Sequence, residues 1–198
     1  MADLAGIVAQ ARNALEKQRP LARVEGVVPD RPGLYAIHGD GNTWTELGLG
    51  KPPDDRPLYV GKAEDSLVAR DVKTHFGDGR TGQSTVRRSF AALLHDDLGL
   101  RGIPRNTQKP GYYSNYGLSV AYDAVLTRWM RERLKLAVWS KPADCAYALA
   151  AIEAVLLAEW QPPLNLQGIV TPWTARLKSA RAVMAEEART WNLAHDDE

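Results

Sequence analysis

One glutamate in this sequence lies where a helix would bury it. The pattern from Ala143 to Trp160 predicts a helix whose apolar stripe includes Leu149, Ile152 and Leu156, and Glu153 falls inside that stripe. Removing a carboxylate from water without a partner costs several kcal/mol. We therefore expect a cation, a metal ion or a hydrogen-bond network to face Glu153. A structural ion pair with an arginine, a position at a partly exposed edge of the stripe, and a functional site all remain open.

Basic side chains follow a tyrosine strand in the stretch PLYVGKAEDSLVARDVKTHF, residues 57–76. Residues 58–61 predict a strand that ends at a glycine, and Asp65 or Ser66 can cap a helix that runs to about Phe76. The basic side chains after the strand are Lys62, Arg70, Lys73 and His75. A second tyrosine strand, GLYAI at residues 33–37, lies upstream and carries Tyr35.

Tyrosine, arginine and glutamate together suit the hydrolysis of a phosphodiester bond. One carboxylate can hold a divalent metal ion that polarises the phosphate, and arginine presents a planar fork of donors that matches phosphate oxygens. A tyrosine has a pKa near about 10 in water, so a role as a base requires positive charge nearby. Lys62, Arg70 and Lys73 could supply that charge.

The composition bounds the class of protein. The chain has 198 residues, which suits one domain with additions or two small domains. Its single cysteine excludes an internal disulfide and a cysteine-rich zinc site. We find no apolar run long enough for a membrane span and no secretory signal, so we expect a cytoplasmic protein. The net charge of +1 does not indicate a polyanion partner, although basic residues gather at 128–141 and acidic ones at 186–198.

Three short strands among several helices predict an α+β fold rather than a doubly wound parallel sheet. The strands are expected at residues 33–37, 58–61 and 135–140. Helices are expected at residues 3–18, 65–76, 84–98, 123–134, 143–160 and 174–191, and the segment between the first two strands is expected to be irregular.

Taken together, these elements resemble the GIY-YIG nuclease family. The matching residues, in the family's order, are GLY at 33–35, YVG at 59–61, Arg70, Glu153 and PPLN ending at Asn165. The sequence YVGKA is similar to the version found in the amino-terminal nuclease domain of the bacterial excision-repair incision subunit and in some restriction enzymes. The resemblance implies a small three-stranded antiparallel sheet flanked by helices. It divides the chain into an N-terminal helix and linker at 1–31, a nuclease domain at 32–166 with an insert at about 78–133, and a C-terminal helix with an acidic tail at 167–198.

The same resemblance implies the roles of the site residues. Glu153 would bind one divalent ion, Mg²⁺ or Mn²⁺, and Tyr35 or Tyr59 would activate or position the attacking water. Arg70 would stabilise charge on the phosphate, and Asn165 would support the structure of the site.

The spacing of the arginine and the histidine departs from the family pattern. The family commonly places the arginine ten residues after the second tyrosine and the histidine four residues later. Here Arg70 lies eleven residues after Tyr59, and His75 lies five after Arg70. On an α-helix this spacing separates the two side chains by about 140°. We therefore retain Arg70, keep His75 as a candidate beside a purely structural role, and allow Lys73 as a replacement cation.

The insert carries candidate contacts to nucleic acid. Ser84 is a predicted helix cap, and Arg87 and Arg88 follow in the first turn, where a helix N-terminus attracts phosphate. Residues 104–117 interleave basic side chains with tyrosines, which suits stacking on bases. The residues expected to contact DNA are Lys62, Lys73, Arg87 and Arg88. The alternative for these segments is an ordinary solvated or packed surface.

The resemblance favours a divalent-metal-dependent DNA endonuclease of a restriction, defence or repair type. The main alternative is an inactive nucleic-acid-binding module with the same fold, and another is a structural protein in which Glu153 pairs with Arg70. A one-metal site cuts one strand per visit, so double-strand cleavage would need a homodimer or repositioning. The nuclease interpretation requires Glu153, Arg70, Tyr35 and Tyr59 to converge on one open cleft.

Overall fold

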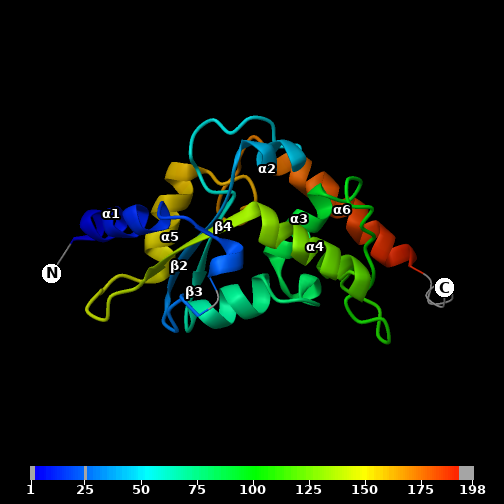
Figure 1. Cartoon of the computed structure of the whole chain (residues 1–198), viewed down its shortest axis with the longest axis horizontal. Helices are drawn as coiled ribbons and strands as arrows, with labels where there is room; N and C mark the ends of the chain where they lie inside the picture. Colours follow the sequence, from blue (N-terminus) through cyan, green and yellow to red (C-terminus); the bar gives the residue numbers. More distant parts are fainter. Residues whose placement is uncertain (1–2, 25, 192–198) are drawn as a thin grey trace.

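An antiparallel sheet lies at the centre of the molecule (Figure 1). The computed structural model describes residues 3–24 and 26–191, without the side chains of residues 70–73. Over that part of the chain the sheet has four strands in the order β1-β4-β2-β3, and each neighbouring pair is antiparallel. The strands are β1 (Arg19–Pro20), β2 (Gly33–Gly39), β3 (Tyr59–Ala63) and β4 (Leu134–Ser140).

The prediction of three strands was wrong by one. The additional strand, β1, has two residues that pair with Leu136 and Lys135 at the edge of β4. A strand of two residues is too short to show an alternating pattern in a sequence. Proline lacks a backbone N–H, and Pro20 is tolerated here because β1 is an edge strand. The three predicted strands are present, with ends that differ by one or two residues.

Most helices lie close to their predicted positions. The α-helices are α1 (Leu4–Leu15), α2 (Gly41–Glu46), α3 (Thr85–Leu93), α4 (Val120–Arg133), α5 (Leu149–Trp160) and α6 (Thr174–Thr190). Three 3₁₀ turns are named η1 (Leu21–Arg23), η3 (Thr81–Gln83) and η4 (Tyr113–Asn115) among the described residues. The short helix α2 was not predicted, and α5 begins six residues later than its pattern suggested.

The predicted helix at 65–76 has a different geometry. It is a π-helix, η2, over Val68–His75. In a π-helix each hydrogen bond joins residues five apart instead of four, and such turns are rare and frequently functional. This geometry changes which residues of the segment share a face.

Helices cover both faces of the sheet (Figure 1). Helices α1 and α5 pack on the face that presents Leu34, Ala36 and Val60. Helices α3, α4 and α6 lie on the side of Tyr35 and Ile37. The division follows from the alternation of side chains along a strand. No helix within residues 3–24 and 26–191 has the length and apolar character needed to cross a bilayer.

Candidate active site

The two strand tyrosines lie against each other on one face of the sheet. Tyr35 on β2 is paired with Gly61 on β3, and the rings of Tyr35 and Tyr59 have centroids 6.0 Å apart. A Cβ atom on Gly61 would lie 2.5 Å from the Tyr35 ring and 2.8 Å from the Tyr59 ring. The glycine of YVG therefore leaves the space that both tyrosine rings occupy.

His75, at the end of η2, contacts the first tyrosine. Its Nε2 atom lies 2.7 Å from the Tyr35 hydroxyl oxygen, and the histidine is fully buried. The expected separation of about 140° between positions 70 and 75 assumed an α-helix, whereas the segment is a π-helix. In a π-helix each hydrogen bond joins residues five apart, so the angle that holds for an α-helix does not apply to positions 70 and 75. The side chains of Arg70 and Lys73 lie outside the described residues.

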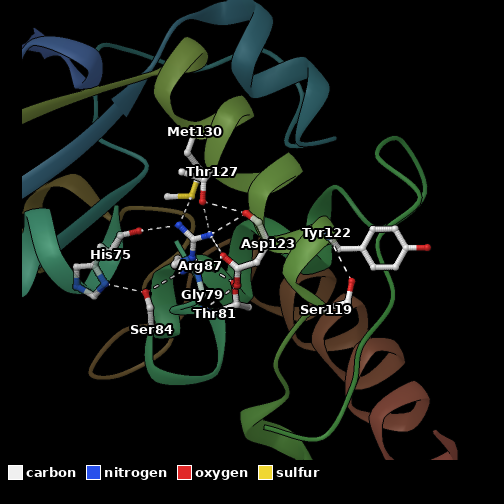
Figure 2. A network of polar contacts seen from close by, with 10 residues as sticks. All are labelled: His75, Gly79, Thr81, Ser84, Arg87, Ser119, Tyr122, Asp123, Thr127 and Met130. Carbon is white, nitrogen blue, oxygen red and sulfur yellow. Dashed lines mark hydrogen bonds and ion pairs between the residues drawn. The ribbon is translucent and has the colours of Figure 1, made fainter. Parts of the chain in front are cut away.

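A buried polar network supports the backbone around His75 (Figure 2). Arg87 on α3 has no exposed surface and forms an ion pair with the Asp123 carboxylate on α4. The guanidinium also donates to the His75 carbonyl oxygen at 3.2 Å and to the Thr127 hydroxyl at 2.8 Å. Burial lowers the pKa of Arg87, and the Asp123 charge opposes that effect. The network ties η2, α3 and α4 together.

The arginines expected to contact DNA are therefore part of the interior. Besides Arg87, Arg88 is only 6% exposed, and it donates to the carbonyl oxygens of Thr81 and Gly82. Burial, followed by the charge of Arg181, lowers the pKa of Arg88 to about 10. Neither side chain is available to a phosphate in this conformation. Their position in the first turn of α3 was correctly predicted, but their burial was not.

Glu153 faces a cationic partner at the edge of the apolar stripe of α5. Its neighbours Ile152 and Leu156 are fully buried, whereas the Glu153 side chain keeps 18% of its surface exposed. Lys62 Nζ lies 3.8 Å from Glu153 Oε2 and 3.2 Å from Glu64 Oε1. Burial raises the pKa of Glu153, the Lys62 ammonium lowers it, and the Glu64 charge raises it. The expected cation is thus the lysine of YVGKA.

Asn165 completes the edge of the sheet. The backbone N–H of Val60 donates to Asn165 Oδ1 at 3.0 Å, and Asn165 Nδ2 donates to the Val60 carbonyl oxygen at 2.8 Å. The Leu164 N–H donates to the Leu58 carbonyl oxygen, so the segment after the two prolines runs beside β3. β3 is an edge strand, and its N–H and C=O groups would otherwise lack partners on that side. The amide therefore holds the strand that carries Tyr59 and Lys62.

These side chains surround one open cleft of about 730 Å³ at the β3 edge. Tyr35 has no exposed surface and contributes to the floor of the cleft, while Tyr59 is half-buried. Polar groups on the walls come from Lys62, Glu64, Glu153 and Asn165. The cleft therefore unites the tyrosines, the lysine, the glutamate and the asparagine named from the sequence. Arg87 and Arg88 do not line it.

The donor set in the cleft fits Mg²⁺ bound through few protein ligands. No group of three histidine, cysteine or acidic side chains within the described part of the chain could hold a metal ion. Mg²⁺ keeps several waters and is commonly held by one or two carboxylates together with substrate phosphates. Glu153, partly exposed in a cleft with room for water and a phosphate, meets that requirement.

Three contributors to the site were not identified from the sequence. Glu64 extends the Lys62–Glu153 pair, Asp123 neutralises Arg87, and Ser84 contacts the His75 ring besides capping α3. Glu64 follows the last residue of β3 and lies two residues after Lys62. The alternation of side chains along a strand could therefore have predicted that Glu64 and Lys62 share a face. Asp123 and Arg87 are 36 residues apart, and no local pattern links them.

Comparison with known proteins agrees with the geometry. The family model of the GIY-YIG catalytic domain matches residues 53–183. No curated protein and no solved structure matches the chain. The matched residues include β3, η2, Glu153 and Asn165, whereas the strand that carries Tyr35 precedes them.

Proposed function

We propose that this chain, which belongs to the family of the GIY-YIG catalytic domain, is a divalent-metal-dependent endonuclease that hydrolyses DNA phosphodiester bonds. Family membership indicates a nuclease. The observation that carries the finer proposal is the convergence of Tyr35, Tyr59, Lys62 and Glu153 on one open cleft. A carboxylate, a cation and phenol groups around an open cleft are groups that phosphodiester hydrolysis needs.

Each side chain has a distinct task in this proposal. Tyr35 or Tyr59, which both line the cleft, positions or activates the attacking water. The positive charge of Lys62 reduces the repulsion between the Glu153 carboxylate and the negative charge of the incoming phosphate. Arg70, on the η2 helix, supplies donors to the phosphate oxygens. Asn165 holds β3 in position at the cleft through its two hydrogen bonds to the Val60 backbone.

Glu153 is the residue that would hold the metal ion. A bound Mg²⁺ or Mn²⁺ would polarise the phosphate and stabilise charge on the leaving oxygen. Lys62 Nζ now lies 3.8 Å from that carboxylate, so the ammonium must move or share the carboxylate when a dication binds. One carboxylate site acts on one strand per visit, and we therefore expect nicking before any double-strand cut.

The test is incubation of the whole chain with supercoiled plasmid DNA in Mg²⁺, in Mn²⁺ and in EDTA, with a structured RNA of similar length in parallel. We expect metal-dependent conversion of supercoiled DNA to the nicked form and no reaction in EDTA. Salt-sensitive DNA binding without cleavage in either metal would instead favour an inactive binding module. Cleavage of the RNA alone would reassign the substrate.

A further inference from the structure

A buried chain of hydrogen bonds joins Tyr35, His75 and Ser84. His75 Nε2 lies 2.7 Å from the Tyr35 hydroxyl oxygen, and His75 Nδ1 lies 2.7 Å from Ser84 Oγ. All three residues have no exposed surface. A neutral imidazole donates from one nitrogen and accepts at the other, so the partner of one nitrogen sets the role of the other.

Within the described part of the chain, Ser84 has one partner that can accept its hydroxyl proton. As the cap of α3, Ser84 Oγ accepts the backbone N–H of Arg87 at 3.1 Å, which uses a lone pair and leaves the proton to donate. Among the described residues, the remaining hydrogen-bond partner of this oxygen is His75 Nδ1. A proton on Nδ1 would leave the buried Ser84 hydroxyl without an acceptor, which is costly.

We propose that Ser84 is a positioning residue that holds neutral His75 in the Nε2–H tautomer, so that His75 donates a hydrogen bond to the Tyr35 oxygen. In this arrangement His75 is not the base that takes the Tyr35 proton, because Nε2 already carries one. The Nε2–H instead stabilises negative charge on the Tyr35 oxygen. The Arg87 guanidinium supports the arrangement from the backbone, because it donates to the His75 carbonyl oxygen (Figure 2).

The consequence for catalysis rests on the proposed nuclease function, but the tautomer does not. The tautomer is measured on the whole metal-free chain, without DNA. The observable is the ¹⁵N shifts of the imidazole in long-range ¹H–¹⁵N correlation spectra at neutral pH. The chain has four histidines, and the His75 signals are those lost in His75→Gln. We expect the Nε2–H pattern. An Nδ1–H pattern or a doubly protonated ring in the wild type would overturn the proposal, whatever any variant does.

Ser84→Asp keeps a side chain that can cap α3 but removes the hydroxyl that donates to His75. Aspartate still accepts the Arg87 N–H but cannot donate to Nδ1, so we expect His75 to move a proton to Nδ1. The matched control is Ser119→Ala, which removes the serine cap of α4 without touching His75, and its spectrum should keep the wild-type tautomer (Figure 2). Retention of Nε2–H in Ser84→Asp would overturn the assignment of the role to Ser84.

The catalytic consequence has its own measurement. If the Nε2–H stabilises the Tyr35 anion, Ser84→Asp should lower the rate of plasmid nicking by roughly tenfold to a hundredfold. It should also move the rising limb of the pH–rate profile to higher pH. An unchanged rate and profile in a variant with the altered tautomer would contradict the link to catalysis. Absence of nicking by the wild type, with the expected tautomer, would refute the proposed function and leave the tautomer assignment in place.

Discussion

Glu153 and Lys62 form the electrostatic centre of the cleft, and Glu64 adds a second negative charge. Lys62 Nζ lies between the two carboxylates, at 3.8 Å from Glu153 Oε2 and 3.2 Å from Glu64 Oε1. Burial makes the largest contribution to the Glu153 pKa and raises it. A carboxylate must be ionised to hold a metal ion. The metal affinity of this site should therefore weaken with falling pH earlier than that of an exposed glutamate.

Two substitutions should shift the pKa of Glu153 in opposite directions. Lys62→Met removes the charge that lowers it, so the pKa should rise further, whereas Glu64→Gln removes a charge that raises it, so the pKa should fall. The pKa of Glu153 is higher in the folded chain than in the unfolded chain. Ionisation of Glu153 therefore lowers the free energy of unfolding as the pH rises from the unfolded-state pKa to the folded-state pKa. Titration of the Glu153 carboxyl carbon by NMR, without metal, measures the shift. Movement of both variants in the same direction would contradict this account of the charges.

Gly61 tests whether the tyrosine rings must occupy their present positions. A Cβ atom there would meet both rings below 3.0 Å, so Gly61→Ala should displace Tyr35 or Tyr59. A misplacement of about 1 Å can cost about a hundredfold in rate. We expect that loss in nicking, with the unfolding transition largely retained. The matched control is Gly111→Ala, because a Cβ at Gly111 meets nothing within 4 Å. Equal rates for the two variants would rule out a steric requirement at Gly61.

At the scale of the elements, the edge of β3 depends on one amide. Asn165→Ala would leave the buried N–H and C=O of Val60 without their side-chain partners. Two such groups cost about 2–6 kcal/mol in the free energy of unfolding. Urea denaturation measures this loss. Asn106→Ala is the control, because Asn106 accepts two backbone N–H groups in an exposed loop and should cost under about 1 kcal/mol. Similar losses for both variants would contradict the role assigned to Asn165.

The sequence was informative for elements whose pattern is local. Tyrosine strands, the helix stripe around Glu153 and the Ser84 cap all follow from spacings of a few residues, and the structure contains each of them. The π-helix was not predictable in this way, because its composition resembles that of an α-helix and only the spacing to His75 was unusual. That unusual spacing was correctly noticed but interpreted with the wrong helix geometry.

The burial of the insert arginines could not be inferred locally. An arginine in the first turn of a helix is commonly solvated, and Arg87 is buried because Asp123, from another helix, neutralises it. The Asp123 carboxylate also accepts the backbone N–H groups of Gly79 and Thr81, so it fixes the loop before α3. Such contacts arise from the packing of α3 against α4, which no short-range pattern encodes.

At the scale of the whole molecule, the site requires a strand that lies outside the matched family region. The match covers residues 53–183, but β2 lies at 33–39 between β4 and β3 and carries Tyr35. A fragment of residues 53–183 would lose the central strand, so we expect no cooperative unfolding transition in urea. A fragment of residues 4–191 should unfold cooperatively. Cooperative unfolding of the shorter fragment would show that β2 is not needed for the fold.

The most direct test of the central claim compares two glutamates on the same helix. Glu153 lines the cleft, whereas Glu159 is exposed and pairs with Arg12. With Mg²⁺ and supercoiled plasmid, Glu153→Gln should lower the nicking rate by at least about a hundredfold, and Glu159→Gln should nick at close to the wild-type rate. Nicking by Glu153→Gln at the wild-type rate would contradict the assignment of the cleft as the active site.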